Sequence, residues 1–157
     1  MKTTFIAAII FIMATTASTA QQNWTEKSKI PELATESFSE KFPDAKAKKW
    51  KSKKATFIAK FSSNGKKYEA TFNADGKWVE TLTRIKWEEL PGPVRKTFYA
   101  SEFIWLNWTS VKKLDTPEKG IIYLIEGDNM NEESSPICRF RLYFSEDGVI
   151  VREESNC

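Results

Sequence analysis

The sequence of 157 residues contains no histidine. This absence excludes the serine–histidine–aspartate and cysteine–histidine arrangements of hydrolases, and every zinc site that uses histidine. The sequence also contains no glycine-rich phosphate loop and no nucleophile elbow. An oxygen-rich stretch at 126–133 lacks the ligand spacing of a calcium-binding loop. We therefore expect no catalytic residues, no metal site and no cofactor, and a protein that is not an enzyme.

Long apolar runs are also scarce. Residues 5–13 form one, which follows Lys2 and precedes the small residues Ser18-Thr19-Ala20. This pattern is typical of a secretory signal peptide, so we expect residues 1–20 to be removed, with a retained N-terminal anchor as the alternative. No later stretch approaches the roughly 20 apolar residues of a membrane-spanning helix. We expect a periplasmic or secreted protein without stable membrane insertion.

Net charge is small, with 24 basic and 21 acidic side chains. A value of +3 is too low to favour nucleic acid as a partner. Positive charge is nevertheless concentrated between Lys46 and Lys54, a stretch with six lysines. These lysines could contact an acidic protein surface or an anionic glycan or lipid, or they could protect a solvated edge strand from aggregation. The sequence leaves both interpretations open.

Cysteine occurs only twice, as Cys138 and Cys157. Disulfides persist in the compartments that exported proteins reach. If residues 146–148 form a three-residue loop, Cys138 falls opposite Asn156, one residue away from Cys157. A frayed last residue can cover that offset, so we expect a disulfide between the two, with two free thiols as the alternative.

Two segments, 68–82 and 140–152, alternate large apolar with polar residues and break at Asp75-Gly76 and Asp147-Gly148. An Asp-Gly step between alternating runs is a strong hairpin signal. Each hairpin follows a stretch with helical spacing: Leu33, Ala34, Phe38 and Phe42 in one, and Val94 and Phe98 in the other. The order of helix and antiparallel strands therefore occurs twice, at about 30–89 and 90–157. This predicts an α+β fold with two tandem repeats, and one domain over 21–157.

Strand register follows from the turn lengths. A two-residue turn at Asn64-Gly65 and a three-residue loop at 74–76 place Phe61 opposite Tyr68 and Phe72 opposite Trp78. These residues share a face that the helix at 33–42 should cover. The same count places Glu80 and Leu82 on the covered face, with Arg152 in the equivalent place of the second copy.

The opposite, open face is the predicted binding surface. It carries interface-forming residue types in both copies. The candidate residues are Lys67, Glu69, Thr71, Arg139, Arg141 and Tyr143, with Trp105 as aromatic rim together with Trp87 and Trp108. Packing in the core is the alternative for the tryptophans, and we favour it for Trp108.

Three stretches resemble the PepSY-like, β-lactamase-inhibitor-protein-like family of bacterial periplasmic proteins. They are Phe42-Pro43-Asp44-Ala45-Lys46 leading to Trp50, the hairpin at 68–81, and Leu90-Pro91 at the start of the second copy. The resemblance implies that the strands of both repeats join in one curved antiparallel sheet, with the helices on one face and the other face open to a partner. It also implies a non-enzymatic role, because relatives by fold inhibit secreted hydrolases and PepSY modules accompany secreted peptidases.

The sequence departs from this family at three places. The turn 52–54 lacks the usual glycine, residues 103–106 are more apolar than expected, and 127–136 is an insertion. Our leading hypothesis is an exported, non-catalytic binding module, an inhibitor or regulator of another envelope or secreted protein. The alternative is a periplasmic binding protein for a glycan, lipid or peptide, with aromatic residues lining a groove between the repeats.

Overall fold

The computed structural model describes residues 30–129 and 137–157. The expected signal peptide and part of the insertion at 127–136 lie outside the described residues. The described chain forms two α-helices, a short 3-10 turn and eight strands. In chain order they are α1 (Glu32–Lys41), β1 (Lys49–Lys53), β2 (Thr56–Ser63), β3 (Lys66–Asn73), β4 (Trp78–Ile85), η2 (Trp87–Glu89), α2 (Gly92–Ala100), β5 (Asn107–Thr116), β6 (Gly120–Asp128), β7 (Arg139–Ser145) and β8 (Ile150–Asn156).

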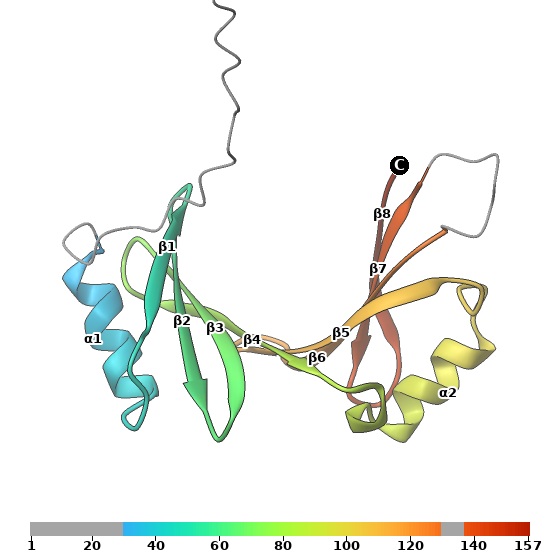
Figure 1. Cartoon of the computed structure of the whole chain (residues 1–157), viewed down its shortest axis with the longest axis horizontal. Coiled ribbons are helices and arrows are strands. Elements are labelled where there is room, and N and C mark those ends of the chain that lie inside the picture. The colour runs from blue at the N-terminus through green and yellow to red at the C-terminus, as the bar shows by residue number, and fades with distance from the viewer. Residues whose placement is uncertain (1–29, 130–136) are drawn as a thin grey trace, which may run out of the picture.

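All eight strands join one antiparallel sheet in which each strand pairs with the next in sequence. The α+β class expected from the sequence is therefore confirmed. The sheet is strongly bent: β1 to β3 stand at one end, β7 and β8 at the other, and β4 to β6 run between them (Figure 1). Helix α1 lies at the β1–β3 end and α2 at the other end (Figure 1). In the described part of the chain, neither helix is long and apolar enough to cross a membrane.

Helix α1 begins after Pro31, whose fixed φ suits the start of a helix. Its buried residues are Ala34 and Phe38. The ring of Phe38 lies edge-on against Phe61 and Trp50, with centroid distances of 5.2 and 5.8 Å. Leu33, which the helical spacing assigned to the buried stripe, is instead 55% exposed. The apolar side of this short helix is therefore narrower than the sequence indicated.

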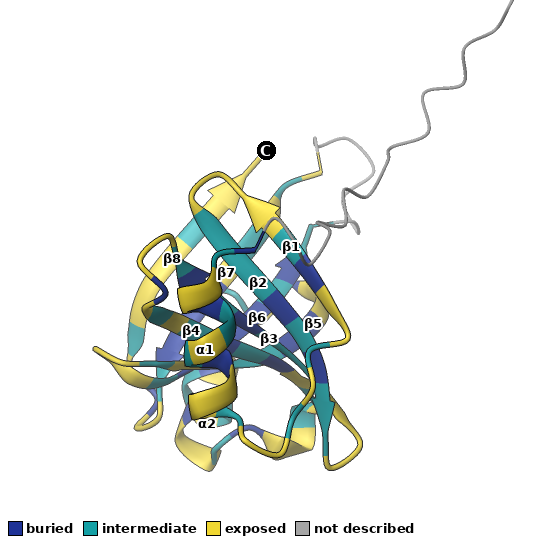
Figure 2. Ribbon diagram, turned by 90° about the vertical axis from the view of Figure 1, so that its left-hand side faces the viewer, coloured by how far each residue is buried: buried dark blue, intermediate teal, exposed yellow. Residues whose placement is uncertain are grey.

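Helix α2 forms a second core at the other end of the sheet. Val94 and Phe98 are its buried residues. They pack with buried side chains of three neighbouring strands, namely Val111, Tyr123, Ile125, Leu142 and Phe144. The outward sides of both helices are exposed, whereas the strands behind them carry buried and half-buried residues (Figure 2). Each helix is thus held mainly by one apolar stripe.

The two turns used to set the register are both present. Asn64 and Gly65 have φ values of 49° and 75°, as a two-residue hairpin turn requires. Gly76 has a φ of 77° at the end of its loop, and Phe72 pairs with Trp78. These pairings were expected from the sequence and are confirmed.

The predicted register beyond Trp78 was wrong, because a β-bulge lies opposite the step from Thr71 to Phe72. Val79 of β4 is the extra residue, between Trp78, which pairs with Phe72, and Glu80, which pairs with Thr71. A bulge adds one residue to one strand and moves every later residue to the other face. Thr81 therefore pairs with Ala70, and Glu80 and Leu82 point away from α1 rather than toward it. A second bulge, at Tyr143/Phe144, pairs Arg152 with Tyr143 and moves Arg152 off the predicted face as well.

The second bulge also changes the place of the cysteines. It pairs Arg139 with Asn156, so that the next pair outward is Cys138 and Cys157. A disulfide joins these two residues, whose Cα atoms are 4.0 Å apart. No fraying of the terminus is needed, because the bulge supplies the one-residue offset that simple counting left.

The hairpin loops hold the first turns of the helices. A Cβ added to Gly76 would lie 2.7 Å from the backbone carbon of Leu33, and one added to Gly148 would lie 2.6 Å from that of Pro93. Both glycines also have positive φ. Glycine is needed at these positions for the close approach of loop and helix as much as for the turn itself.

We predict that Gly76→Ala and Gly148→Ala each lower the free energy of unfolding by about 3 kcal/mol or more, because the helix must move as well as the turn. Gly65→Ala is the control, since Gly65 also has positive φ but nothing lies within 4 Å of its added Cβ. It should cost only about 1 kcal/mol. Urea denaturation measures all three. Equal losses would contradict the proposed helix contact.

We predict that the double variant Cys138→Ser/Cys157→Ser unfolds with a free energy about 3 kcal/mol lower, because the bond closes a loop of sequence separation 19. Guanidinium denaturation should give the same loss for the wild type in reducing agent. Mass measurement after alkylation provides the control: unreduced protein should take up no alkyl group, and uptake of two would show that the thiols are free.

Candidate functional site

We call the side of the sheet that points away from α1 the Thr71 face. It consists of the side chains that alternate with the α1-facing ones, followed through the register from β1 to β8. Six predicted site residues lie on it: Lys67, Glu69, Thr71, Arg139, Arg141 and Tyr143. The first three come from β3 and the others from β7, so the register places residues far apart in sequence on a common surface.

The middle of the Thr71 face is apolar. Leu114, Ile122, Leu124 and Tyr143 are buried, and Leu82 packs against them. Tyr143 was expected to be exposed, but only 8% of it is accessible. Most of this cluster lies on β4 to β6, which run between the two ends of the bent sheet (Figure 1).

Tyr143 is covered by charged neighbours from β8. The guanidinium carbon of Arg152 lies 3.7 Å from the centre of the Tyr143 ring, in a cation–π contact. The phenol hydroxyl donates a hydrogen bond to Oε2 of Glu154, at 3.2 Å. Burial raises the pKa of Tyr143 above its ordinary value. Tyr143 is therefore part of the floor of the surface, and Arg152 is the exposed group above it.

Glu126 is the centre of a charged network beside this floor. Its carboxylate accepts hydrogen bonds from the hydroxyl of Ser110 at 2.5 Å and from Nε of Arg141 at 3.2 Å, and it pairs with Nζ of Lys112 at 2.5 Å. Burial alone would raise the pKa of Glu126, but the hydrogen bonds and charges of Lys112, Ser110 and Arg141 outweigh it and hold the pKa below its ordinary value. Arg141 is thereby fixed in orientation while its side chain stays 56% exposed.

The pKa of Glu80 is shifted in the opposite direction to that of Glu126. It lies on the same face, paired through the register with Thr71. Desolvation raises the pKa of Glu80, and the charge of Arg152 only partly offsets this effect. The two residues come from β4 and β8, so their interaction crosses the floor of the sheet. On the Thr71 face, the charge of Arg152 thus offsets only part of the free energy that desolvation adds to the ionised carboxylate of Glu80.

The Thr71 face is strongly biased toward positive charge. Ten of the 24 basic side chains of the sequence project from its strands, but only five of the 21 acidic ones. The basic residues are Lys49, Lys51, Lys53, Lys60, Lys67, Arg84, Lys112, Arg139, Arg141 and Arg152. The acidic residues are Glu69, Glu80, Glu126, Asp128 and Glu154.

A hollow of about 590 Å³ opens on this face near the β5–β6 turn. Leu114, Ile122 and Tyr143 line it from the floor cluster. Two exposed valines also line it: Val79, which is 40% exposed, and Val151, which is 48% exposed. The alternation of residues after each Asp-Gly step places both valines on the open face, but it does not reveal the hollow, which is formed together with residues of β5, β6 and β7. Val79 and Val151 stand at the same distance after the two Asp-Gly steps, and this equal spacing is the signal in the sequence that relates them.

The tryptophans lie elsewhere. Trp105 is 49% exposed and packs edge-on against Phe140, a residue that belongs to the α2 core, so it does not share the Thr71 face. Trp108 was favoured as a core residue, but it is 47% exposed and stacks on Trp87 with a centroid distance of 5.0 Å. These aromatic rings form a patch beside α2.

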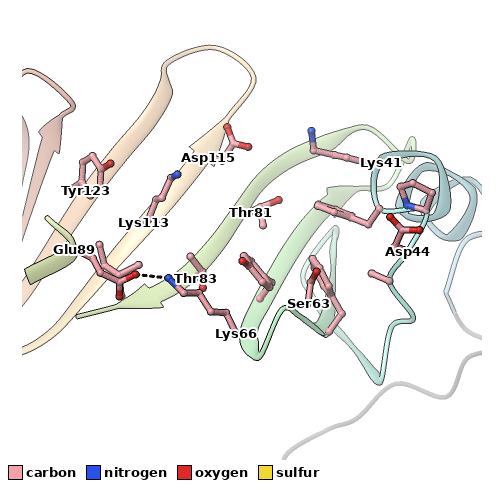
Figure 3. Close-up of a pocket in the computed structure, with 16 residues that line it drawn as sticks. Lys41, Asp44, Ser63, Lys66, Thr81, Thr83, Glu89, Lys113, Asp115 and Tyr123 are labelled. Carbon is pink, nitrogen blue, oxygen red and sulfur yellow. Dashed lines mark hydrogen bonds and ion pairs between the residues drawn. The ribbon is translucent and has the colours of Figure 1, made fainter. Parts of the chain in front are cut away.

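A second cavity, of about 550 Å³, lies between the two ends of the molecule on the α1 side of β4 and β5. Thr81, Thr83, Lys113 and Asp115 line its base (Figure 3). Lys66 and Glu89 pair across its edge (Figure 3). The ring of Tyr68, which is stacked on Phe61, contributes to one wall. We call this cavity the Thr83 cleft.

Metal binding finds no support in the described residues. No group of three or more potential ligands among histidine, cysteine, aspartate and glutamate occurs in 30–129 and 137–157. The carboxylates of the Thr71 face are instead spread over several strands and interact with Lys and Arg side chains.

Comparison with known proteins assigns the family. A family model described as "Putative beta-lactamase-inhibitor-like, PepSY-like" matches residues 55–152. This is more than half of the chain, and the chain belongs to this PepSY-like family, as the hairpin and Leu90-Pro91 resemblance had indicated. No curated protein was found to match the chain.

Solved structures share the fold. A protein described as a putative periplasmic protein from Bacteroides eggerthii DSM 20697 is 25% identical with a TM-score of 0.69, over 80% of this chain and 88% of that one. A DUF2874 family protein from Bacteroides ovatus ATCC 8483 is 21% identical with a TM-score of 0.71, over 80% and 86%. A BLIP-like protein from Bacteroides fragilis NCTC 9343 is 24% identical with a TM-score of 0.67, over 80% and 85%.

We predict opposite effects for two glutamine substitutions on the Thr71 face. Glu126→Gln should lower the free energy of unfolding at pH 7 by about 1–3 kcal/mol, because Lys112 and Arg141 lose their charged partner. Its pKa is lowered in the fold, so this loss should shrink as the pH falls below the ordinary value of 4.5. Glu80→Gln should raise the stability at pH 7, because its desolvated carboxylate costs free energy when ionised.

The pH dependence of Glu80→Gln follows from its raised pKa. The wild-type carboxylate becomes neutral as the pH falls through that pKa, so the gain from the variant should vanish at pH 3. Denaturation curves at pH 7 and pH 3 test both variants. A loss of stability for Glu80→Gln at pH 7 would contradict this account of the face.

Proposed function

We propose that this chain is an exported, non-catalytic binding module that holds another secreted or envelope protein on the Thr71 face. Lys67, Glu69, Thr71, Arg139 and Arg141 would contact that partner, and an inhibitory or regulatory role fits such a module. The observation that carries the proposal is the apolar floor of this face, which is surrounded by charged groups. Binding surfaces commonly combine a well-packed centre with a polar rim.

We infer further that α1 and α2 cover the same face, which leaves the Thr71 face open. The register supports this inference. Ala70 on the α1 side pairs with Thr81, Thr83 pairs with Lys113, and Lys113 pairs with Tyr123 of the α2 core. Because strand residues alternate between faces, both helix cores fall on one side. No helix of the described residues then remains to cover the floor.

Duplication of a helix-and-hairpin unit gives this arrangement a simple origin. The two bulges, at Thr71/Phe72 and Tyr143/Phe144, are 72 positions apart. Gly76 and Gly148 have the same spacing, and each touches the first turn of the helix in its own half. These correspondences support two repeats, at about 30–89 and 90–157, that share the sheet.

The absence of histidine and the family description both favour a protein that binds rather than catalyses. Export is supported by the apolar run at 5–13 with its small-residue site, and by the relative from Bacteroides eggerthii that is described as periplasmic. We therefore place the chain and its partner in the periplasm or outside the cell.

The Thr83 cleft favours a second candidate function, the binding of a glycan, lipid or peptide. Its volume of about 550 Å³ falls within the range of small-molecule sites. It combines aromatic rings at Phe61 and Tyr68 with hydrogen-bonding groups at Thr83 and Lys113. This is a groove between the repeats of the kind that the alternative hypothesis requires.

We predict that the chain captures a partner from an envelope extract and that Val79→Asp/Val151→Asp lowers the captured amount at least about tenfold. Two buried charges in the hollow would oppose docking of an apolar side chain. Quantitative mass spectrometry of the cross-linked complex measures the capture. Leu33→Asp is the control, since Leu33 is an exposed apolar residue on α1.

Two further outcomes of this experiment separate the candidates. Equal capture by wild type and the valine variant would reject the Thr71 face as the binding surface. Loss of capture in Lys113→Glu, with the valine variant unaffected, would assign binding to the Thr83 cleft instead. Circular dichroism of each variant confirms that the fold is retained.

A further inference from the structure

The distribution of charge specifies what kind of partner fits the Thr71 face, and this inference rests on the proposed function. The strands of this face carry ten basic and five acidic side chains, while the rest of the sequence carries 14 basic and 16 acidic ones. A nearly neutral chain therefore presents one positive surface. Such a surface attracts negative partners and repels positive ones.

The hollow on this face adds a second requirement. Its lining combines the apolar floor at Ile122 and Tyr143 with three cationic groups, from Lys77, Lys119 and Arg152, and two carboxylates, from Glu80 and Glu118, so that positive charge is in excess by one. The guanidinium of Arg152 already stacks on the Tyr143 ring, so its position at the wall is fixed. A side chain that enters would meet apolar surface below and positive charge at the margin.

We propose that the partner is a protein with an acidic segment that inserts one aliphatic or aromatic side chain into this hollow and sets its carboxylates against Arg152, Lys77 and Lys119. The carboxylates of Glu80 and Glu154, within the same surface, oppose a uniformly anionic polymer. The buried side chains Leu114, Ile122 and Tyr143 line the bottom of the hollow, where a flat membrane surface would not reach them. A protruding protein segment satisfies both conditions.

Three blocked synthetic pentapeptides serve as probes of this chemistry. The first has the sequence Glu-Asp-Phe-Asp-Glu, the second has Lys in place of each acidic residue, and the third has Ser in place of Phe. Amide chemical shifts of the isotope-labelled protein report both affinity and location. The first peptide should shift the signals of Glu80, Ile122 and Tyr143, and bind at least about tenfold more tightly than either of the others, a difference of about 1.4 kcal/mol.

Charge variants test the contribution of the wall. Arg152→Glu should weaken binding of the first peptide about tenfold, and Lys119→Glu, an exposed turn position, should weaken it in the same direction. Lys96→Glu on α2 is the matched control with the same change of charge on an exposed residue of the other side, and should leave binding unchanged. Salt at about 0.5 M should weaken binding of the two acidic peptides but not of the basic one.

Several results would overturn the proposal: equal binding of the acidic and basic peptides, shifts located outside the hollow, or no binding of the first peptide at about 5 mM. Each of these is distinct from failure of the proposed function. Envelope capture that still depends on Val79 and Val151 would then retain the Thr71 face as a protein-binding surface and reject only its acidic partner.

Discussion

Two β-bulges, at Thr71/Phe72 and Tyr143/Phe144, determine which side chains this sheet presents on each face. Because side chains alternate along a strand, one extra residue moves the whole remainder of β4 and β8 to the other side. Leu82 thereby joins the apolar floor, Glu80 and Arg152 come onto the same surface, and Cys157 falls opposite Cys138. The surface that we assign to binding depends on these two irregularities, which lie 72 positions apart, whereas a third register shift, at Trp108/Ser110, affects only the start of β5.

Charged side chains help to bury the apolar floor of the Thr71 face. Long charged side chains extend over the floor, as the stacking of Arg152 on its cross-strand neighbour Tyr143 illustrates. Arg and Lys can cover apolar surface with their stems while their charged ends stay in water. The resulting surface buries most of its apolar part and keeps the charged ends of these side chains at its margin.

Much of the fold could be predicted from the sequence, because short turns and alternating residues are local signals. The turn at Asn64-Gly65, the hairpin loop ending at Gly76 and the stripe at Val94 and Phe98 all followed from spacing alone. The bulges could not be predicted, since an extra residue after a loop leaves the alternation of types nearly unchanged. The placement of the β3 and β7 candidates on one face was consequently right, and the placement of Glu80, Leu82 and Arg152 on the α1 side was wrong. The burial of Tyr143 depends on side chains of the neighbouring strand β8, which the alternation of residue types does not reveal.

The basic residues of the Thr71 face are not accounted for by protection of the sheet edges. Lysines on an edge strand prevent pairing with other chains, and this explains Lys51 and Lys53 on β1. Arg84, Lys112 and Arg141 lie on β4, β5 and β7, which are interior strands already paired on both sides. Concentrating like charge on one surface opposes folding. The ion pairs of Lys112 and Arg141 with Glu126 account for part of this charge, and the binding of a negatively charged partner that we propose would account for the excess that shares the face with the apolar floor.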